Sequence, residues 1–199
     1  MAEFLPKEDE VLKIIKKWSE PPIKRNKTKT ENYNRILKVL YGNHPEFEEW
    51  WGDSELKKQM EMNVGYFIQD IIGNLKDHKN YEEGHETGLD GENNIKIPIK
   101  YEIKVDEKTT NSSSKDECIG KLKRATEGTG IKPLLIQFFR ENAPTQRSKH
   151  YDIIITGESY INDYVSLDIG GVNGLITHLE RATYIHKLVE EILQRVINK

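Results

Sequence analysis

Residues 95–105 read IKIPIKYEIKV, and this stretch decides the class of fold. Apolar side chains occupy every second position, with Glu102 and Lys104 on positions between them. A period of two predicts a β-strand, because successive side chains of a strand point to opposite faces of the sheet. Pro98 has no backbone N–H, which favours a bulge or an edge segment in the first half of this strand. The expected apolar face carries Ile95, Ile97, Ile99, Tyr101, Ile103 and Val105.

Helical periodicity flanks this strand on both sides. Apolar side chains spaced at i, i+4 and i+7 predict amphipathic helices around residues 8–19, 31–41, 54–76, 118–125 and 183–198. Compact apolar runs at residues 134–139 and 151–155 are suited to buried strands, whereas residues 160–169 fit neither pattern. Residues 81–94, YEEGHETGLDGENN, are rich in glycine and acids, which favours a loop or a hairpin around a short strand.

This order of elements predicts an α/β fold with a mixed central β-sheet flanked by helices. A chain of 199 residues has the length of one domain. We therefore expect a single domain, with an N-terminal helical region over residues 1–53 and an α/β core over residues 54–199.

The composition excludes several classes of protein. Hydrophobic residues make up 36% of the chain and charged residues 32%, and no run of 18 apolar residues could form a membrane-spanning helix. The first ten residues lack the apolar core of a secretory signal. The single cysteine, Cys118, excludes a disulfide framework and a cysteine-based zinc site. We expect a cytoplasmic protein without a membrane partner.

Charge is distributed unevenly along the chain, although the net charge is only −3. Residues 45–94 contain four basic and 13 acidic side chains, and residues 95–150 contain 12 basic and seven acidic ones. This change of sign is consistent with two solvated faces, or with a metal-binding acidic cluster beside a surface that contacts phosphate.

Glu102 and Lys104 share one face of the expected strand, with Cβ atoms about 7 Å apart. Asp90 lies twelve residues before Glu102, and would converge on it if the preceding segment pairs beside the strand. Two carboxylates and a backbone carbonyl suit Mg²⁺, and a nearby lysine can act on a metal-bound water or stabilise charge on a phosphate. Glu83 and Glu86 are alternatives to Asp90 as the carboxylate that would join Glu102. Alternating Glu and Lys on a solvated sheet face is the structural alternative.

These residues resemble a known family. GLD at 88–90 followed by YEIK at 101–104 resembles the motif of the PD-(D/E)XK nuclease superfamily, with a glycine-leucine pair before the aspartate where the motif has proline. HETGLD at 85–90 is similar to the corresponding segment of type II restriction endonucleases. The resemblance covers roughly residues 60–155 and implies a restriction-endonuclease-like fold.

The resemblance implies a Mg²⁺-dependent endonuclease that hydrolyses double-stranded DNA at a short specific sequence. Asp90 and Glu102 would hold Mg²⁺ together with the carbonyl of Ile103. Lys104 would act on the attacking water, and Glu86 would be an accessory acid. Restriction enzymes of this size usually act as homodimers, in which each subunit cuts one strand of a palindrome.

Two polar segments near the motif are candidates for DNA contact. Arg pairs with guanine and Asn or Gln with adenine, whereas short hydroxyl side chains reach bases only at close approach. A flexible loop and a polar hairpin are the respective structural alternatives. The candidates are Thr109, Thr110, Asn111, Ser112, Ser113 and Ser114, and Arg140, Asn142, Gln146, Arg147 and Lys149. A third basic segment, at residues 24–29, is either a phosphate clamp or a disordered loop.

Two other functions are compatible with the sequence. The protein could be a DNA repair or recombination nuclease of the same superfamily, such as a junction resolvase. It could also be a non-enzymatic interaction module, in which Glu102 and Lys104 are surface charges and the long helices bind a partner. The motif does not specify the recognition sequence, the cut position or the number of metal ions.

Overall fold

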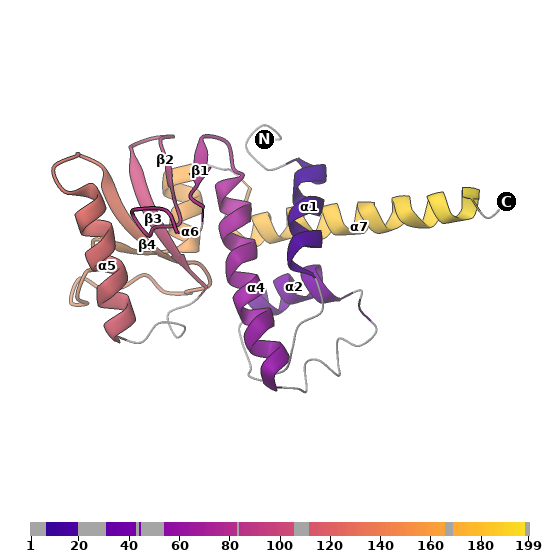
Figure 1. The fold of residues 1–199 in the computed structure, drawn as a ribbon, viewed down its shortest axis with the longest axis horizontal. Coiled ribbons are helices and arrows are strands. Elements are labelled where there is room, and N and C mark those ends of the chain that lie inside the picture. The colour runs from indigo at the N-terminus through magenta and orange to yellow at the C-terminus, as the bar shows by residue number, and fades with distance from the viewer. Residues whose placement is uncertain are drawn as a thin grey trace. The chain divides into compact units, whose positions relative to one another are not determined.

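The computed structural model describes residues 7–19, 31–42, 44, 54–82, 84–105, 112–165 and 169–197 (Figure 1). Their contacts divide the chain into two units. We call residues 65–172 the sheet unit, and residues 7–64 with 173–197 the helical unit. Within the described part of the chain, no helix combines the length and the hydrophobicity needed to cross a membrane.

A five-stranded mixed sheet forms the centre of the sheet unit. Its strands lie in chain order: β1 (His78–Asn80), β2 (Gly91–Asn93), β3 (Ile99–Lys104), β4 (Lys132–Gln137) and β5 (Ile154–Thr156). β1, β2 and β3 are antiparallel neighbours, whereas β3, β4 and β5 run parallel. α4 (Ser54–Gly73) precedes the sheet and α5 (Ser112–Thr126) connects β3 to β4. The expected α/β class with a mixed sheet and flanking helices is confirmed.

Apolar side chains cover both faces of this sheet. On one face, α5 packs its buried residues against β4 and β5, and the shared core contains Leu89, Cys118, Ile119, Leu122, Leu135, Ile153 and Ile154. On the other face, a Cβ added to Gly65 of α4 would lie 3.5 Å from the side chain of Val105. α4 therefore lies in van der Waals range of the end of β3 at this position.

The expected strand over residues 95–105 is too long, because only Ile99–Lys104 are paired in β3. Asn93 of β2 lies opposite Ile99, so residues 94–98 must form the turn that joins these antiparallel strands. Ile97, expected on the apolar face, is 44% exposed in this turn.

One further expectation is corrected, and two segments for which the sequence gives no single assignment are assigned. α5 begins at Ser112, so the serines of the expected loop form the first helical turn, where Ser is favoured. The 140–149 segment is not a hairpin, because β4 and β5 are parallel and need a crossover connection. Residues 160–165 form a π-helix, η1 (Tyr160–Val165), which follows the short helix α6 (Gly157–Ser159).

The last helix, α7 (Gly171–Ile197), begins twelve residues before the expected start at residue 183. Its glycine-rich opening, GGVNG at 170–174, concealed this start, because glycine disfavours helices. The buried stripe nevertheless continues through this part of the helix, at Leu175, Ile176, Leu179 and Ala182.

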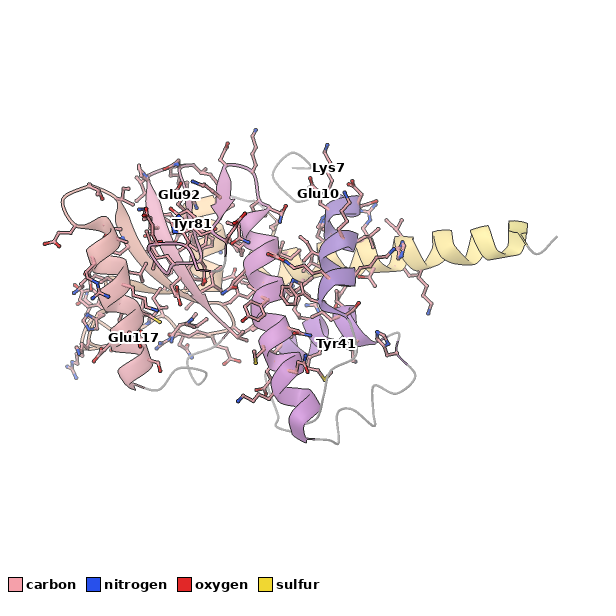
Figure 2. All side chains as sticks on the ribbon, viewed as in Figure 1. Lys7, Glu10, Tyr41, Tyr81, Glu92 and Glu117 are labelled. Carbon is pink, nitrogen blue, oxygen red and sulfur yellow. The ribbon has the colours of Figure 1, made fainter. Side chains whose placement is uncertain are left out.

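α1 (Glu8–Trp18), α2 (Glu31–Tyr41), the first half of α4 and most of α7 make up the helical unit. Tyr41, labelled in Figure 2, donates a 2.8 Å hydrogen bond to the Trp18 carbonyl and accepts one of 2.8 Å from Asn63. Arg35 of α2 makes a bidentate pair with Glu180 of α7, at 2.8 and 2.7 Å. These contacts join the helices of this unit.

A buried polar network lies beside β1 and β2. His78 Nδ1 is 3.0 Å from the Lys76 carbonyl oxygen, so this nitrogen carries the proton. His78 Nε2 then accepts from the Tyr160 hydroxyl at 2.8 Å, and this hydroxyl accepts from Asn93 Nδ2 at 2.7 Å. Burial lowers the pKa of His78 to about 4, although the Lys76 carbonyl and Asp77 favour its protonation.

The depressed pKa of His78 predicts a loss of stability in acid. Between pH 6.5 and about 4, the unfolded chain binds a proton that the folded network excludes. The free energy of unfolding should therefore fall as the pH drops through this range, with a slope contribution below about 1.4 kcal/mol per pH unit. Urea denaturation should show a flatter dependence for His78→Gln. Equal slopes for both proteins would contradict a neutral, buried His78.

Candidate active site

Glu102 is buried on the face of the sheet that α5 covers. In the parallel register it lies beside Leu135 of β4, which in turn lies beside Ile154 of β5. Side chains in register share a face, and both neighbours belong to the core under α5. Glu102 is consequently only 5% exposed. The alternative that it lies on a solvated sheet face is wrong.

The two carboxylate oxygens of Glu102 have different environments. Oε1 forms an ion pair of 2.6 Å with Lys104 Nζ and accepts a weak contact of 3.7 Å from the Cys118 thiol. Oε2 is buried and has no hydrogen-bond partner among the described residues. An unpaired carboxylate oxygen in a buried position costs free energy. A group that binds this oxygen would remove that cost.

Asp90 reaches the same region from the start of β2. Its Oδ2 accepts a 2.6 Å hydrogen bond from the backbone N–H of Ile103. The next residue, Gly91, lets β2 lie against β1 and the Tyr101 side chain, because a Cβ there would lie 2.5 Å from the Lys79 carbonyl oxygen and 2.6 Å from the Tyr101 hydroxyl. In the GLDG sequence, Asp90 thus accepts a hydrogen bond, whereas Gly91 leaves room for the atoms packed against it.

The electrostatics of Asp90 reflect its position beside a second acid. Burial, and then the Glu102 carboxylate, raise the pKa of Asp90 to about 7. The Ile103 N–H, Lys104 and a side-chain hydrogen bond from Gln69 of α4 oppose this shift. Asp90 therefore exchanges its proton near neutral pH, where most aspartates are fully ionised.

Lys104 stays charged at this site. Burial by itself lowers its pKa, but the Glu102 carboxylate and Asp90 outweigh burial, so the pKa of Lys104 is raised. Its side chain remains 28% exposed, whereas that of Glu102 is 7% exposed. Solvent thus reaches Lys104 more easily than Glu102.

The carbonyl of Ile103 points toward the Asp90 side of β3. In a strand, the N–H and C=O of one residue point to the same side, and alternate residues point to opposite sides. The Lys104 carbonyl accepts from Phe138 next to β4, and the Ile103 N–H donates to Asp90 on the other side. Asp90 and the Ile103 carbonyl therefore occupy the same edge of β3.

Glu86 does not join this group. It is exposed in the turn before Asp90, and the charges that shift the pKa of Asp90 do not include it. In the same segment, His85 stacks on Tyr81, whose hydroxyl donates to Glu92 at 2.5 Å (Figure 2). Glu83 lies outside the described residues.

The structure separates the expected DNA-contact residues. Thr109, Thr110 and Asn111, and the basic segment at 24–29, lie outside the described residues. Ser112, Ser113 and Ser114 open α5, and the side chain of Ser114 is half-buried, whereas those of Ser112 and Ser113 are not described. Asn142, Gln146, Arg147 and Lys149 are exposed between β4 and β5.

Within this connection, two basic residues have described partners. Lys149 pairs with Asp116 of α5 at 2.8 Å. Arg140 donates to Gln137 Oε1 at 2.6 Å and to the Asn142 carbonyl at 2.5 Å. Arg140 is therefore tied to the end of β4, next to β3.

Sequence reasoning missed Gln69, Gln137 and the contact made by Cys118. Gln69 lies among the apolar residues of a clear helix, and Gln137 lies inside an apolar run, so each was obscured by the pattern around it. Cys118 is buried, and its thiol contacts Glu102 Oε1.

Among the described residues, no group of three or more His, Cys, Asp or Glu side chains could hold a metal ion. Asp90 and Glu102 provide two carboxylates. A cation that binds here would therefore need backbone or water oxygens as its other ligands.

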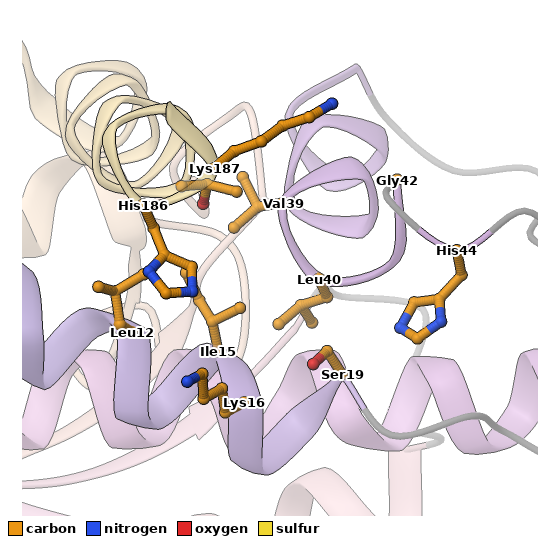
Figure 3. Close-up of a pocket in the computed structure, with 11 residues that line it drawn as sticks. Leu12, Ile15, Lys16, Ser19, Val39, Leu40, Gly42, His44, His186 and Lys187 are labelled. Carbon is orange, nitrogen blue, oxygen red and sulfur yellow. The ribbon is translucent and has the colours of Figure 1, made fainter. Parts of the chain in front are cut away.

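A cavity in the helical unit has a different character (Figure 3). It measures about 440 Å³ and its lining includes Leu12 and Ile15 with Lys16, His186 and Lys187. None of its described lining residues is Asp or Glu, so it offers no carboxylate pair for hydrolysis.

No family model matches the chain, and neither a curated protein nor a solved structure is significantly similar to it.

The raised pKa of Asp90 predicts that Asp90→Asn stabilises the fold above pH 7. As the pH rises from 3.8 to about 7, the unfolded chain releases this proton before the folded protein does, so the wild type loses stability. Asparagine can still accept from Ile103 and carries no charge beside Glu102. Urea denaturation should show Asp90→Asn to be more stable than the wild type, with the exposed Glu86→Gln as an unchanged control. A less stable Asp90→Asn above pH 7 would contradict the repulsion between Asp90 and Glu102.

Proposed function

We propose that this protein is a Mg²⁺-dependent endonuclease that hydrolyses double-stranded DNA at a short specific sequence, as type II restriction endonucleases do. The observation that carries the proposal is the environment of Glu102. This buried carboxylate pairs one oxygen with Lys104, leaves the other unpaired, and repels Asp90. Perturbed acids that destabilise a fold are typical of functional sites.

The residues present fit Mg²⁺. Glu102 Oε2, the Asp90 carboxylate and the Ile103 carbonyl are hard oxygen donors, and Mg²⁺ usually keeps several waters beside one or two carboxylates. A divalent cation would satisfy Oε2 and remove the repulsion that raises the pKa of Asp90. When bound, Mg²⁺ supplies a Lewis acid and lowers the pKa of a coordinated water.

Lys104 would stabilise charge at the reacting phosphate. Its raised pKa keeps the ammonium protonated at neutral pH, which favours this role over removal of a proton from water. The ion pair with Glu102 fixes the ammonium beside the proposed metal ligands. Negative charge that develops on phosphate oxygens in the transition state would then meet a fixed positive charge.

The surroundings of the site support DNA as the substrate. Residues 95–150 carry the excess of basic side chains, and the exposed Asn142, Gln146 and Arg147 follow β4. In open α/β sheets, ligands bind at the carboxyl ends of parallel strands, and Lys104 ends β3 in this way. We propose a homodimer, because the two-fold symmetry of a palindrome matches that of two subunits.

Replacing Lys104 with Ala should reduce DNA cleavage by about 100-fold or more, because it removes charge stabilisation from the transition state. Binding to DNA should change far less. Lys100→Ala is the matched control, since Lys100 lies on the same strand and face and contacts only the Ala125 carbonyl at 3.4 Å among its described hydrogen bonds. Single-turnover cleavage rates of both variants test the assignment, and equal losses would contradict it.

Mg²⁺ should raise the thermal midpoint of the wild type, because the ion binds the folded protein and not the unfolded chain. Asp90→Ala and Glu102→Gln should each lose this shift and cleavage activity, whereas Glu86→Ala should keep the shift. Differential scanning fluorimetry over a Mg²⁺ titration measures the effect. If Glu86→Ala loses the shift and Asp90→Ala keeps it, Glu86 is the carboxylate that joins Glu102.

Cleavage of plasmid DNA distinguishes the related functions. Discrete bands with Mg²⁺ support restriction, and a smear supports a non-specific repair or recombination nuclease. Absence of cleavage by the wild type would favour an interaction module, for which the exposed Tyr184 and Leu188 of α7 are the clearest surface feature.

A further inference from the structure

Gln137 is the last residue of β4 and is completely buried, yet its amide nitrogen has no hydrogen-bond partner among the described residues. Buried amides are normally paired, because an unpaired donor loses its hydrogen bonds to water and gains none. No contact among the described residues therefore explains the unpaired amide nitrogen of Gln137.

The position of Gln137 places it beside the proposed catalytic lysine. In the parallel register Gln137 lies between Lys104 of β3 and Thr156 of β5, so the three side chains share the α5 face. Thr156 does not satisfy the amide, because its hydroxyl interacts with the backbone N–H and the hydroxyl of Ser159. Lys104 can only donate and cannot accept from Gln137.

The orientation of the amide is fixed by Arg140. A guanidinium only donates hydrogen bonds, so the atom that faces Arg140 at 2.6 Å must be the oxygen, Oε1. The nitrogen Nε2 consequently points away from Arg140. Gln137 thus holds Arg140 with one atom and keeps a donor for another acceptor.

Three residues with donor groups come from the carboxyl ends of β3 and β4 and the segment that follows: Lys104, its register neighbour Gln137, and Arg140, which is bonded to Gln137. Glu102 is already paired with Lys104 through Oε1. A cluster of donors at the carboxyl ends of parallel strands suits an anionic oxygen, and the strand ends are where such sheets bind ligands.

We infer that Gln137 Nε2 donates to a non-bridging oxygen of the phosphate that is cleaved, with Arg140 held beside the same phosphodiester. This inference rests on the proposed function and adds a residue that contacts the substrate. This contact would give the amide nitrogen the acceptor that it lacks. The hydrogen bond would strengthen in the transition state, because negative charge grows on that oxygen.

The test compares Gln137→Met, which keeps the length but has no donor, with Gln137→Glu, which keeps the shape and can still accept from Arg140. We expect kcat for cleavage of a mapped plasmid site to fall by about 100-fold in Gln137→Met, in line with loss of one oxyanion donor. Gln137→Glu should lose more, because its carboxylate repels the phosphate. Affinity for the same DNA with Ca²⁺ in place of Mg²⁺ should fall by less than about tenfold in Gln137→Met.

Thermal midpoints separate this role from a structural one. Gln137→Met removes the unpaired donor and also the Oε1 acceptor of Arg140, so its midpoint should fall slightly, whereas Gln137→Glu keeps that acceptor. A loss of kcat in variants that stay folded at the assay temperature would not reflect unfolding. A kcat within about threefold of an active wild type, in either variant, would overturn the inference and leave the proposed function standing. If Gln137→Met fails to fold, Gln137→Glu alone decides. An inactive wild type would overturn both.

Discussion

The hydrogen bond from the Ile103 N–H to the Asp90 carboxylate joins the acidic turn to the carboxyl-terminal end of β3. β2 pairs with β3 only from Ile99 to Tyr101, so beyond that point this edge of β3 has no strand beside it. The carboxylate takes the place of a neighbouring strand at Ile103. It satisfies the backbone and at the same time brings a second acid next to Glu102. Without this contact, the sheet would keep its strands but lose the arrangement of the site.

The fold tolerates this arrangement because the energetic cost is local. Repulsion between Asp90 and Glu102 and the unpaired Glu102 oxygen destabilise the folded state. The apolar core under α5, on the same face of the sheet, stabilises the folded state. Lys104 compensates part of the buried charge but leaves one carboxylate oxygen without a partner. The packing of α5 therefore keeps the acids in place despite their mutual repulsion.

Local sequence patterns predicted the α/β class, the amphipathic helices and the core of β3, because each depends on periodicity within a short segment. They did not predict the start of β3, which depends on the register with β2, nor the burial of Glu102, which depends on α5 and on Leu135 in another strand. The pairing of Glu102 with Lys104 follows from alternation along one strand and was predictable. The role of Gln137 was not, because a single polar residue in an apolar run has no local signature.

The polar groups of the site are divided across β3. Asp90 and the Ile103 carbonyl place acceptor oxygens on the side of β2, Glu102 places its carboxylate on the α5 face of β3 itself, and Gln137 and Arg140 place donors on the side of β4. Lys104 lies between them, because it pairs with Glu102 and is the register neighbour of Gln137. Phosphodiester hydrolysis by a metal needs this division, because oxygen ligands hold the cation while donors bind the phosphate anion. A solvated strand with alternating charges has no reason to bury its carboxylate or to orient an unpaired amide beside its lysine. The separation of acceptors from donors thus supports a reacting phosphate at Lys104 more strongly than the short motif does by itself.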